Sequence, residues 1–292
     1  DIASAEESPD LLVRAFPNHG ELWLYGQRTT EVHVNTATGD FPFEPQQNAT
    51  MQRGCAAKRS VAQEDNTLFW LGDDRMVYRA DGYSPVRIST HAIEKAIQDY
   101  TTISDAVAFV YTQNGHKFYV LTFPTELATW VYDIATEKWS QRQSFEEGRW
   151  RASGYAFVFN KNLVGDFENG NIYEINANSY TENGTTIQRI ITLPVVFNDT
   201  KRIVYSNFIA DFDSGLGLVS GQGSDPQVMM RYSDDGGYTW SSELWRSMGK
   251  IGEYFKRIIW HRLGIGRQRV FELIISDPIP VHLTGAYINE TD

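Results

Sequence analysis

Cysteine, long apolar runs and positive charge are all scarce in this sequence of 292 residues. The single cysteine, Cys55, excludes an internal disulfide framework and any zinc site built from cysteines. The apolar runs are too short to span a membrane, and no charged segment leads into an apolar one as in a signal peptide. We therefore expect no membrane insertion by this chain. Its first residue is Asp1 rather than Met, which we interpret as a sign of a trimmed or processed piece.

Acidic residues outnumber basic ones, 37 against 26, which gives a formal net charge of -11 and a sequence pI near 5.0. A protein that grips nucleic acid by releasing counterions needs patches of Lys and Arg. The charge balance therefore argues against such a protein. It is compatible with a surface past which nucleic acid slides without being held.

Aromatic residues are plentiful and suit a protein built from sheets, with 8 Trp, 15 Tyr and 16 Phe. Short apolar strands recur, each followed by a polar or Gly turn and a second strand. The comparable positions in four such hairpins are roughly 45–50 residues apart, a spacing typical of β-propeller repeats. These positions are Trp23, Trp70, Tyr119 and Leu163.

The spacing predicts an all-β protein and favours a β-propeller over an ordinary two-sheet sandwich. At this period the chain has room for about six blades. It has equal room for four or five blades and a separate β-domain from about Lys201 onward, and the sequence leaves both arrangements open. We divide the chain into an acidic, disordered start (1–10), propeller blades (11–200), and further blades or a C-terminal β-domain (201–292).

One short helix is predicted near residues 90–100. Thr90 is a suitable N-cap residue, and one face of the following segment is apolar. The apolar positions fall at i, i+3, i+4 and i+7: Ile93, Ala96, Ile97 and Tyr100. We expect this face to pack onto the sheet and fill a rim or a gap between blades, although a partner-binding helix has the same pattern.

The clearest motif is an Asp box of the pattern S-x-D-x-G-x-T-W. It consists of Ser233, Asp235, Gly237, Thr239 and Trp240. The box is known from sialidases, but glycosidase chemistry also needs an acid/base carboxylate, a nucleophile and, for sialic acid, clustered arginines. The arginines here are scattered. We therefore interpret the box as a structural turn in which the carboxylate accepts backbone N–H groups and Gly supplies a positive φ.

Other polar clusters lack the spacing that chemistry requires. The pairs Asp73-Asp74 and Glu146-Glu147 are adjacent in sequence, so we expect solvated turns or surface charge. None of the six histidines has the spacing of metal ligands, and we predict no catalytic residue, no cofactor and no metal. A basic cluster near the C-terminus is either a cationic hairpin turn or a contact to DNA or an acidic neighbour. It comprises Arg257, His261, Arg262, Arg267 and Arg269.

Residues 67–97 read TLFWLGDDRMVYRADGYSPVRISTHAIEKAI: an apolar WLG strand, a second strand with Tyr, and a Pro/Arg–Ile-Ser-Thr approach to a helix with Ile-Glu. Three later segments are ATWVYDIATEKW (128–139), LVGDFENGNIYEI (163–175) and RYSDDGGYTWSS (231–242). In this order they resemble the packaged-DNA stabilisation proteins, which are the tail-hub proteins (tail accessory factors) of short-tailed bacteriophages (podoviruses). The resemblance runs over most of the chain, and residues 67–97 are its most specific part.

The resemblance implies a structural virion protein of the phage tail, assembled in the cytoplasm of the bacterial host. Such a protein would be a propeller subunit of a homo-oligomeric ring, expected to be a hexamer, beneath the portal and its adaptor ring. The ring would close the portal channel, retain the packaged DNA and mount the tail needle and tailspike proteins. An acidic channel wall suits this role, because salt-bridged phosphates would hold the DNA in place.

Aromatic loops are the expected contacts between neighbouring subunits, because interfaces are enriched in such residues. The candidates lie around Trp245, Tyr254–Phe255 and Trp150. The alternative function is a sialidase-type or glycan-binding propeller, prompted by the Asp box at 233–240 and by the many Trp and Tyr residues.

Overall fold

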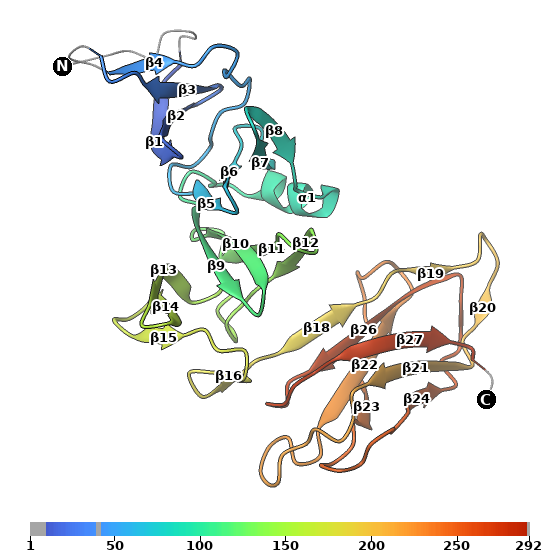
Figure 1. Ribbon diagram of the computed structural model, residues 1–292. Helices are drawn as coiled ribbons and strands as arrows, with labels where there is room; N and C mark the ends of the chain where they lie inside the picture. Colours follow the sequence, from blue (N-terminus) through green and yellow to red (C-terminus); the bar gives the residue numbers. More distant parts are fainter. Residues whose placement is uncertain (1–9, 39–41, 291–292) are drawn as a thin grey trace. The chain divides into compact units, whose positions relative to one another are not determined.

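The computed structural model describes residues 10–38 and 42–290 (Figure 1). The described chain consists of antiparallel strands and one helix, which confirms the all-β prediction. It divides into two compact units, residues 1–176 and 177–292, and each is described by itself.

The first unit contains four antiparallel sheets, and within each sheet the strands lie side by side in chain order. We call these sheets blades 1 to 4. Blade 1 comprises β1 (Leu12–Asn18), β2 (Glu21–Gly26), β3 (Thr30–Asn35) and β4 (Phe43–Pro45). Blade 2 comprises β5 (Ala62–Glu64), β6 (Thr67–Leu71), β7 (Val77–Asp81) and β8 (Ser84–Arg87). Blade 3 comprises β9 (Val107–Gln113), β10 (His116–Phe123), β11 (Ala128–Asp133) and β12 (Lys138–Gln141), and blade 4 comprises β13 (Ala152–Val158), β14 (Lys161–Asp166) and β15 (Ile172–Glu174).

The first strands of successive blades approach one another. Strand β9 contacts both β5 and β13, and a parallel bridge joins Arg59, just before β5, to Val107 at the start of β9. Because each blade adds its later strands outward from the first, the four sheets have the arrangement of propeller blades. The single helix, α1 (His91–Asp99), follows blade 2, as predicted.

The core of this unit lies between the blades rather than within them. Successive residues of a strand point to opposite faces of its sheet. On β6, Leu68 and Trp70 therefore pack with blade 1, whereas Phe69 and Leu71 pack with blade 3 and the helix. All four are fully buried, which explains why β6 reads as a continuous apolar run rather than as an alternating one.

Strand β10 repeats this arrangement one blade further on. Tyr119 and Leu121 face blade 2, and Val120 faces the cluster shared with blade 4. Trp150 belongs to that same cluster, 6.1 Å from Phe109 between ring centroids. The Trp150 ring is thus partly buried where blades 3 and 4 join, and a subunit contact at its loop stays a prediction.

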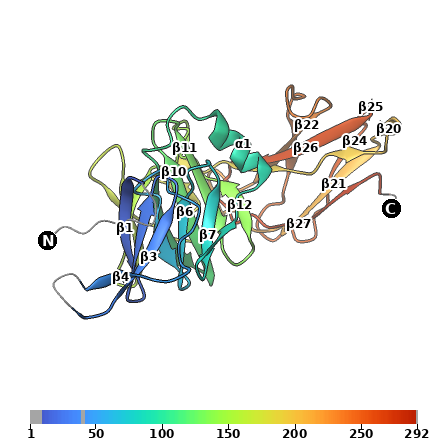
Figure 2. The ribbon, with the colours of Figure 1, turned by 90° about the horizontal axis from the view of Figure 1, so that it is seen from above.

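The two larger sheets of the second unit face each other across one core, and Figure 2 shows β26 and β22 above β21 and β27. One sheet has the order β18-β26-β22-β23, with β19 also on β26, and the other has the order β24-β21-β27. The core includes Phe208, Trp260, Phe271 and Leu273. The strands are β16 (Thr181–Glu182), β17 (Thr185–Thr186), β18 (Arg189–Thr192), β19 (Val196–Phe197), β20 (Ile203–Val204), β21 (Asn207–Phe212), β22 (Gln227–Ser233), β23 (Leu244–Ser247), β24 (Ile258–His261), β25 (Ile265–Gly266), β26 (Gln268–Ile275) and β27 (Leu283–Ile288).

The position of the division corrects the sequence-based boundary. We expected blades over residues 11–200 and a change near Lys201, whereas the second unit begins at Ala177. The reason is that β18 and β19 pair with β26, a strand far along the chain, which no local pattern indicates. Of the arrangements left open, the described part shows four blades followed by a separate β-domain rather than about six blades. The predicted acidic start falls on residues 1–10, of which 1–9 lie outside the described residues.

Candidate functional site

Four of the five residues of the Asp box form a hydrogen-bonded turn at the end of β22. The Ser233 hydroxyl donates to Asp235 Oδ1 at 2.7 Å and accepts the backbone N–H of Gly237 at 2.8 Å. Asp235 also accepts the Thr239 backbone N–H at 2.9 Å and the Thr239 hydroxyl at 2.6 Å. Gly237 has φ = 101°, a value that residues with a Cβ rarely adopt. The bonds from Thr239 and Ser233 hold the pKa of the Asp235 carboxyl well below its usual value.

Trp240, the last residue of the box, lies under a guanidinium. Arg231 Cζ is 4.7 Å from the Trp240 ring centroid, and Arg231 forms an ion pair with the buried Glu272 at 2.5 Å. Both oxygens of Asp235 are thus used in the turn, and Glu272 is paired. A pair of free, opposed carboxylates of the kind used in glycoside hydrolysis is not formed by these residues.

The basic cluster predicted near the C-terminus separates into an internal and an external part. Arg269 is only 2% exposed and forms a bidentate ion pair with Asp234 at 2.6 and 2.8 Å. Its guanidinium also stacks on Tyr232 and Tyr205 at 3.9 and 4.3 Å. The remaining four members, Arg257, His261, Arg262 and Arg267, are exposed.

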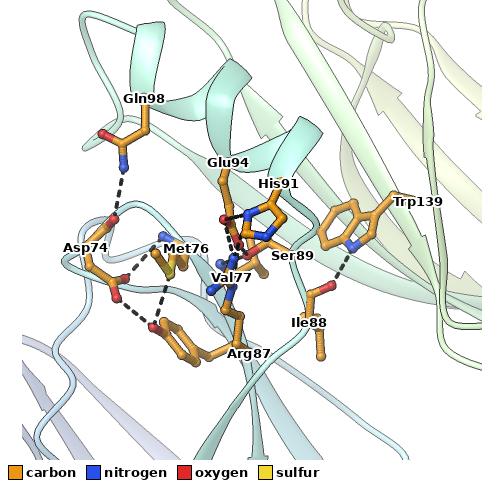
Figure 3. A network of polar contacts seen from close by, with 11 residues as sticks. Asp74, Met76, Val77, Arg87, Ile88, Ser89, His91, Glu94, Gln98 and Trp139 are labelled. Atoms are coloured by element: carbon orange, nitrogen blue, oxygen red, sulfur yellow. Dashed lines mark hydrogen bonds and ion pairs between the residues drawn. The ribbon is translucent and has the colours of Figure 1, made fainter. Parts of the chain in front are cut away.

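Asp73 and Asp74 lie in the turn between β6 and β7 and bind the segment that follows blade 1. Figure 3 shows the contacts of Asp74 within its own turn. Asp73 accepts the backbone N–H of Gly54 at 2.9 Å, and Asp74 accepts the Tyr78 hydroxyl at 2.6 Å. Arg53 forms an ion pair with Asp74 at 2.9 Å. The two carboxylates are therefore occupied by local partners.

The second acidic pair, Glu146 and Glu147, also lies in a turn. Glu147 pairs with Arg151, whose other nitrogen is 3.1 Å from the buried Asp166. The hydrogen bond from Arg151 to Glu147 raises the pKa of the guanidinium above its usual value. This ion-pair network links the loop before blade 4 to the end of β14.

Helix α1 is joined to blade 2 by a polar network (Figure 3). Ser89 donates to Glu94 at 2.8 Å and accepts the backbone N–H of Val77 at 3.1 Å. Arg87 binds both oxygens of Glu94, each at 2.5 Å. Burial by itself would raise the pKa of the Glu94 carboxyl, but the bonds from Ser89 and Arg87 outweigh it and lower the pKa.

The helix packs into the gap between blades 2 and 3, where Ile93 and Ile97 join the core. Thr90 occupies the N-cap position, as predicted, although its side chain makes no capping hydrogen bond. At the other end, Arg75 donates to the carbonyl oxygens of Ile97 and Tyr100 at 2.9 and 2.7 Å. A cation at this place also matches the negative end of the helix dipole.

Two aromatic regions that the sequence suggested as subunit contacts are exposed in the second unit. Trp245 on β23 is 52% exposed, and Tyr254 and Phe255 are 65% and 98% exposed. Phe255 has φ = 61°, which is uncommon for a residue with a bulky side chain. These side chains are available for contact with another surface.

Among the cavities in the described part of the first unit are two that the sequence did not predict. One of about 500 Å³ is lined by residues of blades 1 and 2, including Glu21, Trp23 and Tyr83. The other, of about 320 Å³, lies between blades 3 and 4 and is lined by Arg59 and Arg149 among others. Within the described residues, no His, Cys, Asp or Glu side chains gather in a group of three or more that could hold a metal ion. No helix in the same range is long and apolar enough to cross a membrane.

Comparison with known proteins connects both units to one phage protein. The family model described as bacteriophage P22 Gp10, beta-propeller, matches residues 1–180, and the model described as bacteriophage P22 Gp10, beta-sandwich, matches residues 188–291. The chain belongs to the bacteriophage P22 Gp10 family. This confirms the resemblance to the packaged-DNA stabilisation and tail-hub proteins, and the fold of a propeller followed by a second β-domain.

Membership of the Gp10 family makes the chain a structural phage protein of the virion. No curated protein sequence matches the chain. A glycoside hydrolase structure is 9% identical, with a TM-score of 0.26 and coverage of 94% of this chain and 82% of that one. An extracellular domain of a one-component system from B. thetaiotaomicron is 8% identical, with a TM-score of 0.21, covering 88% of this chain and 54% of that one. An arabinoxylan arabinofuranohydrolase of glycoside hydrolase family 43 from Bacillus subtilis is 11% identical, with a TM-score of 0.20 and coverage of 98% and 97%. Such low scores support no inference about activity.

Proposed function

We propose that the chain is the tail-hub subunit of a phage virion and forms a ring beneath the portal and its adaptor. In this role the ring, expected to contain six copies, closes the portal channel, retains the packaged DNA and mounts the tail needle and tailspikes. Assembly takes place in the cytoplasm of the bacterial host. The observation that carries the proposal is the match of two Gp10 family models, in order, to the two units of the chain.

The charge of the chain supports the proposed channel. A formal net charge of -11 disfavours tight binding of a polyanion, since tight binding requires many Lys and Arg contacts to phosphates. DNA that must leave quickly is better served by a wall that repels it mildly. Sequence-specific DNA binding by this chain is not part of the proposal.

The exposed aromatic residues of the second unit support contact with neighbouring subunits. Trp245, Tyr254 and Phe255 together present large apolar surface to solvent, and buried aromatic anchors supply much of the energy of protein interfaces. We place the subunit contacts of the ring, or those with another virion protein, at these loops.

The test measures the size of the protein with and without a portal–adaptor ring by sedimentation. We expect a ring-sized species that joins the portal–adaptor ring, and a strict monomer that never joins it would contradict the proposal. Phe255→Ser should weaken assembly, and because its side chain is 98% exposed the free energy of unfolding should change little. Phe159→Ser, at a second exposed ring, is the matched control.

We also propose that the Asp box is a structural turn and that the chain does not cleave glycans. Both oxygens of Asp235 are engaged by Ser233 and Thr239, which leaves neither free to act on a sugar. A fluorogenic sialoside should therefore not be turned over. Turnover that is abolished by a carboxylate substitution would instead favour the sialidase-type alternative.

A further inference from the structure

The cavity between blades 3 and 4 contains a buried arginine without an anionic partner. Arg149 is 6% exposed, and the nearby charged residues Glu147 and Arg151 pair with each other. The Arg149 Nε donates to the Trp150 carbonyl oxygen at 3.4 Å, and its guanidinium carbon lies 4.1 Å from the Phe167 ring centroid. Among the described residues, no carboxylate oxygen lies within 4 Å of its nitrogens, although a buried charge is costly without a partner.

The surroundings leave the positive charge of Arg149 incompletely compensated. Burial lowers the pKa of its guanidinium below the usual value, and the more distant carboxylates of Asp105 and Glu147 oppose this only in part. Asp166 also lines the cavity, but it is engaged by Arg151 at 3.1 Å. Among the described residues, the single hydrogen bond of the Arg149 guanidinium comes from its Nε, and the residue lines the cavity.

A second arginine lines the same cavity from a different blade. Arg59 lies three residues before β5, which begins at Ala62, and Arg149 lies three residues before β13, which begins at Ala152. The two residues therefore occupy equivalent places in blades 2 and 4. Strand β9 of blade 3 contacts both β5 and β13, so both arginines line the cavity near the starts of three innermost strands.

The remaining lining of the cavity is a mixture of aromatic and hydroxyl groups. Phe109 and Phe167 contribute rings, and Thr122 and Ser153 contribute hydroxyl groups. A volume of about 320 Å³ is in the range of small-molecule sites. Two planar guanidinium groups match the oxygens of a phosphate or a carboxylate, and the rings suit an apolar or planar body attached to it.

We propose that Arg59 and Arg149 form a binding site for a small organic oxyanion, a phosphate or a carboxylate carried on an apolar body. The anion accepts hydrogen bonds from both guanidinium groups, and its body packs against Phe109 and Phe167. This site is separate from the proposed subunit contacts and does not depend on the ring. A ligand bound at this site contacts residues of blades 2, 3 and 4 near their innermost strands.

The test titrates the full chain with phenyl phosphate, benzoate and inorganic phosphate at constant ionic strength and follows the Tm. A ligand that binds only the folded state raises the Tm in a saturable way. We expect such a rise for the wild type, larger for the aromatic probes than for inorganic phosphate because of the two Phe rings. The comparison of phenyl phosphate with benzoate shows which oxyanion the site prefers.

Two variants and a control make the test specific. Arg149→Gln and Arg59→Gln should each weaken the apparent Kd by roughly tenfold or more, as expected for the loss of charge-assisted bonds. Lys138→Gln, which removes an exposed positive charge on β12, should leave the Kd unchanged. If Arg149→Gln fails to fold, the Kd of Arg59→Gln is compared with that of the wild type instead, because Arg59 is exposed. The absence of saturable binding, or equal responses in all four proteins, would overturn the proposal.

Discussion

At the scale of single residues, the carboxylates that look most catalytic in the sequence are all engaged in turns or ion pairs. Asp74 and Asp235 each accept a hydroxyl group at 2.6 Å, and Glu147 pairs with Arg151. Adjacent acidic residues could be recognised from the sequence as turn formers. A distant partner such as Arg53 could not, because Arg53 reaches Asp74 only through the fold of the chain.

Asp235 should make the stability of the chain depend on acid pH. Its folded-state pKa lies below the ordinary value of 3.8, so the carboxylate stabilises the fold above that pH. This contribution should be lost as pH falls through the lowered pKa, since protonation breaks the bonds from Thr239 and Ser233. Urea unfolding between pH 5 and pH 2.5 should therefore show a smaller loss in Asp235→Asn than in the wild type. Glu243→Gln, at an exposed carboxylate, is the control and should follow the wild type.

Glu94 should contribute more to stability than the charges exposed on the same helix. Glu94→Gln removes the charge that accepts bonds from Ser89 and Arg87, at a site only 7% exposed. We expect the free energy of unfolding to fall by about 2 kcal/mol. Lys95→Gln breaks only the exposed pair with Asp99 and should change it by about 0.5 kcal/mol or less. Equal effects in denaturant titrations would show that the network around Glu94 is not stabilising.

At the scale of elements, the hairpins were predictable but the way in which blades join was not. Both faces of β6 and β10 are buried, so the continuous apolar runs that mark them in the sequence have a direct structural cause. The helix was also predictable from its apolar face, whereas the Arg75 cap at its end was not. That contact depends on a residue of the β6–β7 turn, which lies far from the helix end in sequence.

Gly54 should be essential for the junction of blades 1 and 2. A Cβ at this position would lie 2.3 Å from the carbonyl carbon of Gln27 and 2.4 Å from the backbone nitrogen of Arg28. Since backbone cannot move aside cheaply, we expect Gly54→Ala to lower the free energy of unfolding by about 1–3 kcal/mol. Gly154→Ala on β13 is the matched control, because a Cβ there meets no atom within 4 Å. Chemical denaturation of the two variants decides the matter, and equal stability would contradict the expected clash.

At the scale of the whole molecule, each unit has its own core. Leu121 lies in the core shared by blades 2 and 3, and Leu273 lies in the core of the second unit. Separate cores should allow the units to unfold in separate transitions. In calorimetry, Leu121→Ala and Leu273→Ala should each lower one transition, by about 2–5 kcal/mol of unfolding free energy. A single transition that both variants shift equally would show that the two units unfold as one.

The sequence by itself determined the all-β class, the hairpin repeat, the helix after blade 2 and the family. These features depend on local periodicity, on turn residues and on the specific run at 67–97. All of these are set by residues close together in the sequence. Only the tertiary structure shows the boundary at Ala177, the packing of Trp150 between blades 3 and 4, the burial of Arg269, and the cavity that Arg59 and Arg149 both line. Each of these depends on strands or side chains that are far apart along the chain, so no local pattern could indicate them.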